Sequence, residues 1–290
     1  MTTPTELRQA LGRLGIWMHP RAARNLDPVE FARKTEEAGF RAVWVPGVDD
    51  AAALDALEPI LAGTTRLVVA TGIANIWTWE PADLAARADR LAEAFPGRFI
   101  LGLGNSHAPR VEQTGQAYLK PYSKTVSFLD ELPSTRAPVV LAALGPKMLA
   151  LSRDRTLGAY PYFNPPEHVE FAREILGPDP LLVSEVGTAL ATGAEGEAHA
   201  RGYAKGYLRL PNYTNNLRRF GFTDEDLGNG GSERLLDTIA PHGPEKSAER
   251  IRQHLDAGAD HVVVHLVGDG GRFAPQDLGQ AAELLSDLTN

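Results

Sequence analysis

Eight short apolar segments, each followed by a helical pattern, constrain the fold of this chain more than any other feature. They run almost without polar interruption, unlike the alternating pattern of a strand with one face in water. Near-continuous apolar strands are typical of parallel sheets covered on both faces. The segments are 14–18, 42–46, 67–72, 99–104, 138–145, 158–163, 181–188 and 261–268. Eight strand–helix alternations predict an α/β protein, a (β/α)8 (TIM) barrel, with an open doubly wound sheet as the alternative.

One interval departs from this alternation. Residues 189–260, between the seventh and eighth predicted strands, are too many for a simple strand–helix connection. They contain helical patterns and a "GNGG" turn at 228–231. We expect a helical insertion at about 195–240, within a single domain that spans 1–290. The polar and aromatic residues of "YLRLPNYTNNLRRF" (207–220) predict that it borders or covers a pocket, as loops at barrel mouths often do.

The charge and the residue types present exclude several classes of function. A net charge of −8 and a pI near 5.5 argue against a surface for nucleic acid or for an anionic membrane. The chain has no cysteine, which excludes thiolate catalysis, and its histidines show no metal-ligand spacing. No apolar run reaches the ~18 residues of a membrane span, and no signal peptide is evident. We therefore expect a cytoplasmic protein without a metal site.

Polar residues at the ends of the predicted strands are candidates for catalysis, because barrel active sites collect at the C-terminal ends of the strands. His19 follows the first strand, Ser106 and His107 follow the fourth, and Glu185 lies in the seventh. An imidazole titrates near neutrality, so His107 is the first candidate for a proton donor or acceptor, ahead of His19 and Glu185. An ordinary turn with a capping serine would also explain Ser106 and His107.

Glu185 has a possible partner on the neighbouring strand of a barrel. Alternation along the strands places Glu185 and His265 where they could pair inside the barrel. Such a pair is either a buried structural contact or part of a catalytic site, and the residues alone leave both interpretations open.

The segment "LAALGPKMLALSRDR" (141–155) reads as a strand, a tight turn and a helix. Gly145 and Pro146 stand where the first N–H groups of the helix are free, and Lys147 follows directly. A helix start of this kind suits a phosphate group, although an ordinary strand–helix turn has the same pattern.

The third predicted strand ends unusually. Its run of β-branched residues breaks at Gly72, continues from Ile73 to Asn75, and then reaches Trp77 and Trp79. Aromatic rings beyond a strand end either flank a pocket or fill the core.

Several of these segments resemble the bacterial luciferase-like superfamily, and in particular its branch of probable F420-dependent oxidoreductases. The resemblance runs from about Gly12 to Gly268 and is carried by "AGFRAVWVPG", "LVVATGIANIWTWEPADLAARADRLAEAFPGRFILGLGNSHAP", "PVVLAALGPKMLALSRDRTLGAYPYF" and "YLRLPNYTNNLRRFGFTDED". It implies a (β/α)8 barrel, usually a homodimer, with a flavin or deazaflavin at the C-terminal mouth.

The resemblance also implies where the cofactor lies. It predicts a non-proline cis peptide at Gly72–Ile73 behind the deazaflavin ring, a ring contact from the loop at Ser106 and His107, and a phosphate at the Gly145 turn. The residues expected to contact the cofactor are Gly72, Ile73, Asn75, Ser106, His107, Gly145, Pro146, Lys147, Met148 and Tyr160.

One position departs from the family. Several relatives have an acidic residue just after the second strand, where this chain has Gly47 followed by Asp49 and Asp50. The activity of the sugar-phosphate dehydrogenases is therefore not carried over. The leading hypothesis is an oxidoreductase that transfers a hydride between coenzyme F420 and a small organic substrate. The alternatives are an FMN-dependent monooxygenase and a flavin- or deazaflavin-binding protein without turnover.

Overall fold

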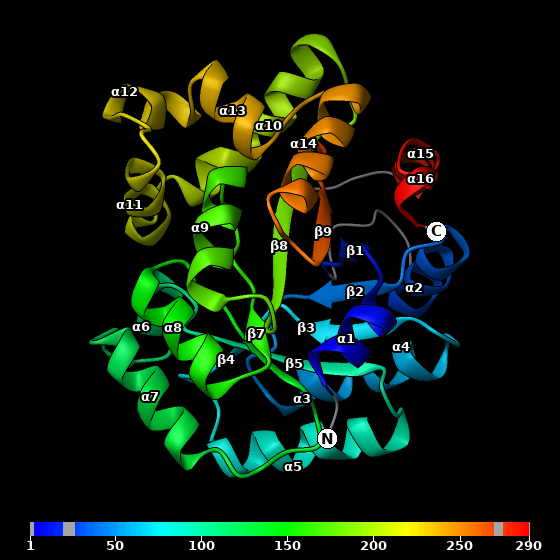
Figure 1. Cartoon of the computed structure of the whole chain (residues 1–290), viewed down its shortest axis with the longest axis vertical. Coiled ribbons are helices and arrows are strands. Elements are labelled where there is room, and N and C mark those ends of the chain that lie inside the picture. Colours follow the sequence, from blue (N-terminus) through cyan, green and yellow to red (C-terminus); the bar gives the residue numbers. More distant parts are fainter. Residues whose placement is uncertain (1–2, 20–26, 270–274, 290) are drawn as a thin grey trace.

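The computed structural model describes residues 3–19, 27–269 and 275–289, and its parallel strands close into a barrel (Figure 1). The sheet order is β3-β2-β1-β9-β8-β7-β6-β5-β4, and β3 also pairs with β5, which closes the ring. β3 and β4 are two halves of the third barrel strand. The strands are β1 (Leu14–Trp17), β2 (Ala42–Val45), β3 (Val68–Thr71), β4 (Ala74–Asn75), β5 (Phe99–Gly104), β6 (Val139–Leu141), β7 (Gly158–Ala159), β8 (Leu181–Thr188) and β9 (His261–Leu266). The predicted (β/α)8 barrel is confirmed.

Helices surround this barrel. Most begin with a proline in the first turn, where a missing N–H costs no hydrogen bond. None in the described ranges is long and apolar enough to cross a membrane. They are α1 (Pro4–Leu11), α2 (Pro28–Glu37), α3 (Ala51–Asp55), α4 (Glu58–Ala62), α5 (Pro81–Ala94), α6 (Ala108–Glu112), α7 (Pro121–Glu131), α8 (Pro146–Arg155), α9 (Pro166–Leu176), α10 (Gly193–Tyr207), α11 (Pro211–Arg219), α12 (Asp224–Leu227), α13 (Glu233–Ile239), α14 (Pro244–Asp256), α15 (Pro275–Leu284) and α16 (Ser286–Thr289).

Two strands are shorter than predicted by four residues or more. The sixth was expected at 158–163, but β7 ends at Ala159. Pro161 follows soon after and has no N–H to continue a ladder. The fifth was expected at 138–145, but β6 ends at Leu141 because the chain turns into α8 at Gly145.

The third barrel strand breaks at the predicted place. The Gly72–Ile73 peptide is cis, and β4 resumes at Ala74. The hydroxyl of Thr71 donates to the carbonyl of Gly102 at 2.7 Å and accepts from its N–H at 2.8 Å, which ties the strand to β5 above the break. A Cβ on Gly72 would lie 2.7 Å from the ring of Trp17, so only glycine fits between the strand and this indole.

The insertion lies between β8 and β9, as predicted, and comprises α10, α11, α12, the short 3₁₀ helix Gly228–Gly230 and α13. In Figure 1 α10, α12 and α13 lie at the top of the molecule, and α11 lies below α12, level with α9. Their apolar side chains pack with Phe163 after β7 and Val267 after β9, at the C-terminal ends of the strands. The N–H of Ala189 donates to the Pro241 carbonyl at 3.1 Å, and the N–H of Gly243 donates to the Ala189 carbonyl at 2.8 Å. The insertion therefore leaves and re-enters the barrel at one point.

Close strand packing makes Gly102 sensitive to substitution. A Cβ there would lie 2.1 Å from the Thr71 carbonyl oxygen, which is backbone and cannot swing away. We expect Gly102→Ala to lower the free energy of unfolding by roughly 2–3 kcal/mol, measured by urea denaturation.

Gly202, inside α10, is the matched control because a Cβ there meets nothing within 4 Å. Gly202→Ala is expected to stabilise the chain by up to about 1 kcal/mol through helix propensity. Equal stability of wild type and Gly102→Ala would contradict the tight contact between β3 and β5.

Candidate active site

Glu185 is the most buried acidic group at the C-terminal mouth of the barrel, with 1% of its surface exposed. Its Oε2 accepts the N–H of Phe163 at 3.1 Å, and its Oε1 accepts the hydroxyl of Tyr203 at 2.7 Å. Nδ1 of His265 lies 3.0 Å from the same Oε1. The structure thus brings Glu185 and His265 together, as the strand pattern predicted. With three donors on its two oxygens, the carboxylate serves to position its neighbours.

A group of tyrosines extends this network into the insertion. The hydroxyl of Tyr162 lies 3.0 Å from Nδ1 of His265 and 2.7 Å from the hydroxyl of Tyr207 on α10. Burial, and next the negative charge of Glu185, raise the pKa of Tyr162 and Tyr203 well above the usual value. These hydroxyls therefore remain protonated donors at neutral pH. Sequence reasoning pointed to the segment that contains Tyr207 but missed Tyr162 and Tyr203, because the pairing between insertion and barrel has no local signature.

His107 stands at the start of α6, directly after β5, and is half-buried. Its ring lies 5.5 Å from that of Tyr213 on α11, so the insertion reaches this loop. Its Nδ1 is buried and has no hydrogen-bond partner among the described residues. Burial, and next the charge of Arg110, lower the pKa of His107 below 6.5. At neutral pH His107 is therefore an uncharged imidazole with one nitrogen available.

We expect the imidazole of His107 to titrate below pH 6.5, and Arg110→Met to move its pKa upward. The reason is that a nearby cation disfavours a second positive charge. Proton NMR of the ring carbon protons measures both values. A titration at or above pH 6.5 in the wild type would show that this ring is well hydrated.

Two other polar atoms at strand ends have no partner in the described structure. Asn75 ends β4 and is 1% exposed; its Oδ1 accepts the N–H of Trp77, while its Nδ2 is unpaired. Tyr160, just after β7, lies inside the barrel against Trp44 and has an unpaired hydroxyl. Buried polar groups normally find partners. Asn75, Tyr160 and His107 therefore each have a polar atom that could bond to a ligand with hydrogen-bond donors and acceptors.

The predicted phosphate turn is formed as expected. Gly145 caps α8 without a side-chain bond, Pro146 occupies the first turn, and Lys147 is exposed. The N–H groups of Met148 and Leu149 bond back to the Gly145 carbonyl, both at 3.0 Å, whereas no bond among the described residues uses the N–H of Gly145 or Lys147. These two donors and open space at Gly145 suit an anion. The side chain of Met148 packs instead against the apolar layer outside the barrel.

The structure gives the remaining predicted residues other surroundings. His19 is exposed after β1, Ser106 has a left-handed backbone with φ 55°, and Ile73 packs beside Gly104. Asp50 caps α3 by accepting the N–H of Ala53 at 2.8 Å, and Asp49 pairs with Arg110. The acidic residues after β2 are thus already engaged.

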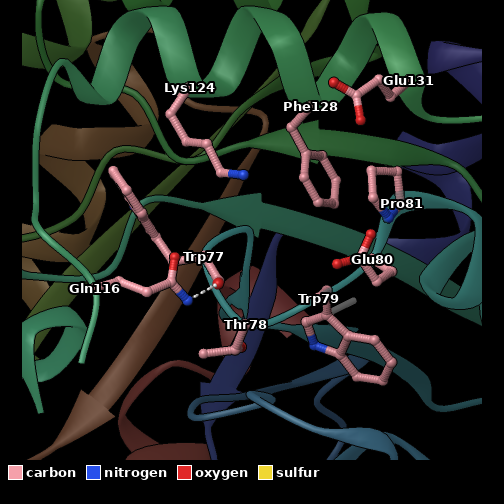
Figure 2. A pocket seen from close by; sticks show the side chains of 9 residues that line it. All are labelled: Trp77, Thr78, Trp79, Glu80, Pro81, Gln116, Lys124, Phe128 and Glu131. Carbon is pink, nitrogen blue, oxygen red and sulfur yellow. Dashed lines mark hydrogen bonds between the residues drawn. The ribbon is translucent and has the colours of Figure 1, made fainter. Parts of the chain in front are cut away.

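Trp77 and Trp79 line a pocket of about 260 Å3 between the start of α5 and α7 (Figure 2). Trp79 is 6% exposed, and its N–H donates to the Val48 carbonyl at 3.0 Å. The ammonium of Lys124 lies 5.8 Å from the centre of the Trp77 ring. Figure 2 shows the Glu80 and Glu131 carboxylates on the other side of Phe128 from Lys124, so the pocket has walls of opposite charge. Both tryptophans border this pocket, and Trp79 also belongs to the apolar core, so each of the two interpretations is confirmed in part.

Comparison with known proteins shows what this chain resembles. The profile of the family described as luciferase-like monooxygenase matches residues 10–133. An F420-dependent secondary alcohol dehydrogenase, solved with an F420–acetone adduct, matches at 16% identity and a TM-score of 0.71, covering 96% of this chain and 98% of that chain. The coenzyme F420-dependent tetrahydromethanopterin reductase from Methanopyrus kandleri gives the same four values.

A third structure contains a different cofactor. It is the oxygenating constituent of 3,6-diketocamphane monooxygenase from Pseudomonas putida in complex with FMN, a type II Baeyer–Villiger monooxygenase. It matches at 14% identity and a TM-score of 0.69, covering 96% of this chain and 97% of that chain. At such identities the likeness establishes the shared fold. Together with the profile, it confirms the resemblance to the luciferase-like superfamily.

Proposed function

We propose that this luciferase-like barrel is an oxidoreductase that transfers a hydride between coenzyme F420 and a small organic substrate. The observation that carries the proposal is the set of buried, unpaired polar atoms at the strand ends, on Asn75, His107 and Tyr160. Asn75 ends β4, His107 precedes α6 after β5, and Tyr160 follows β7, so all three stand at the ends of barrel strands. The two F420-dependent enzymes of the same fold support this choice of cofactor. When bound, F420 accepts or donates a hydride at C5 of its ring.

The residues of this chain would bind, orient and exchange a proton. Asn75 would hold the ring edge, and Trp17, which fits against Gly72, would support the strand behind it. His107, uncharged at neutral pH, would accept or donate the proton that accompanies hydride transfer. Tyr207 and Tyr213 of the insertion would cover the mouth and exclude water.

Titration of the purified chain with F420 and with FMN, followed by tryptophan fluorescence, tests the choice of cofactor. We expect F420 to quench the emission, and Trp17→Phe to remove much of the quenching because this indole contacts Gly72. Quenching by FMN alone would favour a monooxygenase, the alternative supported by the FMN-containing relative. Quenching by neither would contradict both functions.

The phosphate of the cofactor is expected at the Gly145 turn. Lys147→Glu should weaken cofactor binding about tenfold, or ~1.4 kcal/mol, because it replaces an attractive charge near a helix start with a repulsive one. The loss should shrink as salt rises. Fluorescence titration at low and high salt measures it.

Lys34→Glu is the matched control for this substitution. Lys34 lies on α2 and pairs with Glu30 at 3.7 Å, on the opposite side of the barrel from α8 in Figure 1. The change in net charge is the same, yet cofactor affinity should stay within about twofold. An equal loss in both variants would indicate a general electrostatic effect, and no loss in Lys147→Glu would place the phosphate elsewhere.

A further inference from the structure

His168 is a buried histidine next to the Gly145 turn that the proposed chemistry does not use. It lies in the first turn of α9, which packs against α8, and none of its surface is exposed. Its Nε2 lies 2.9 Å from the carbonyl oxygen of Leu144. Leu144 directly precedes Gly145, so this contact reaches the backbone immediately before the turn.

The chemistry of the contact fixes the protonation of the ring. A carbonyl oxygen only accepts, so Nε2 must carry the proton. Burial lowers the pKa of His168 to about 4; the hydrogen bond to the Leu144 carbonyl opposes this shift, and the nearby charge of Arg219 adds a smaller effect in the lowering direction. The ring is therefore neutral at pH 7, with a bare Nδ1 that has no partner among the described residues. Among the described residues, the side chain therefore makes one hydrogen bond, from Nε2 to the Leu144 carbonyl.

The same ring also contacts the insertion. Its centre lies 5.5 Å from the ring of Phe220, at the end of α11, and 6.0 Å from that of Phe171 on α9. The guanidinium of Arg219 lies 5.6 Å from the Phe171 ring. Packing on these faces limits rotation of the imidazole and keeps Nε2 directed at Leu144.

We infer that His168 is a positioning residue, which holds the Leu144 carbonyl so that the free N–H groups of Gly145 and Lys147 face a cofactor phosphate. The inference rests on the proposed function, because it assumes that the phosphate binds at this turn. Without the donor, the peptide after Leu144 can rotate, and the two N–H groups no longer point in one direction. The loss should therefore fall on the phosphate and spare the ring of the cofactor.

The test compares His168→Gln with His168→Met in the full chain. Glutamine keeps an N–H donor near the position of Nε2, whereas methionine has a similar size and no donor. Binding of FMN and riboflavin, which differ by one phosphate, is measured by fluorescence. We expect His168→Met to weaken FMN binding about fivefold to tenfold and to change riboflavin binding less than twofold. His168→Gln should stay close to the wild type. If F420 is the cofactor, F420 and its phosphate-free deazaflavin replace this pair.

A second measurement needs no cofactor. Within 145–149, hydrogen–deuterium exchange of the Met148 and Leu149 amides, which bond to the Gly145 carbonyl, should be faster in His168→Met than in His168→Gln. His254→Met is the control, because His254 is also buried but its Nδ1 lies 2.9 Å from the hydroxyl of Ser184, whereas the Leu144 carbonyl is contacted by His168. It should leave both the FMN-to-riboflavin ratio and the exchange at 145–149 unchanged.

The outcomes separate the two ideas. Equal weakening of FMN and riboflavin in His168→Met, with unchanged exchange, would overturn the positioning role. A wild type that binds FMN and riboflavin equally would contradict the phosphate site of the proposed function. In that case exchange at 145–149 still decides whether His168 holds the turn.

Discussion

Glu185→Ala is expected to lower the free energy of unfolding by about 3–5 kcal/mol, the range for breaking a buried charged contact. The substitution leaves the N–H of Phe163, the hydroxyl of Tyr203 and Nδ1 of His265 without their shared acceptor. All three groups lie at the junction of barrel and insertion, and water has little access to replace the carboxylate there.

Urea denaturation of Glu185→Ala and Glu185→Gln separates charge from hydrogen bonding. Glutamine keeps one acceptor oxygen and the side-chain volume, so its loss should be about half that of alanine. Because Tyr203 lies on α10, limited proteolysis should also cut the insertion of the alanine variant faster than that of the wild type. A loss below about 1 kcal/mol for alanine would show that water reaches the site.

Acidification from pH 6.5 toward pH 4 is expected to destabilise the chain steeply. Burial lowers the pKa of His168 and His261 to about 4 and that of His254 to about 3. In the unfolded chain these rings take up protons near pH 6.5, while in the folded chain they remain neutral. The unfolded state binds more protons in this window, so stability is complete above pH 6.5 and falls as the pH decreases.

Each of these histidines contributes about 1.4 kcal/mol per pH unit, and the three together about 4 kcal/mol per pH unit, between roughly pH 6 and 4.5. Urea denaturation at a series of pH values measures the slope. His254→Met should reduce the slope by one proton, and its stability at pH 8 gives the separate cost of the packing change. A slope near zero between pH 6 and 5 would contradict neutral buried rings.

The barrel could be predicted because its determinants are local. Continuous apolar runs gave the bounds of β5 and β8 to the residue. The ends of β6 and β7 were placed too late, since an apolar run continues past the last ladder bond when a proline or a helix start follows. The insertion was located because helical patterns replaced the expected single helix.

In the candidate site, too, the features with a local sequence signal could be predicted and the others could not. The Gly145 turn and the Glu185–His265 contact follow from strand ends and alternation, which the sequence displays. Tyr203 and Tyr207 share one face of α10, yet nothing in their i, i+4 spacing states that this face meets the barrel mouth. The bond from His168 to Leu144 joins a side chain to a backbone carbonyl, and backbone acceptors have no residue type that a sequence can reveal.

Backbone hydrogen bonds join the two ends of the insertion, so the whole segment could be replaced by another one. Because Ala189 bonds to both Pro241 and Gly243, the two ends of the excursion are already adjacent, and a short turn could span them. If the proposed function holds, a different excursion at this point would change the residues above the mouth of the barrel without altering the strands below. For engineering, residues 190–240 can be replaced as one unit. A segment from another protein, grafted between Ala189 and Pro241, would change the cover of the barrel mouth and leave the barrel itself unchanged.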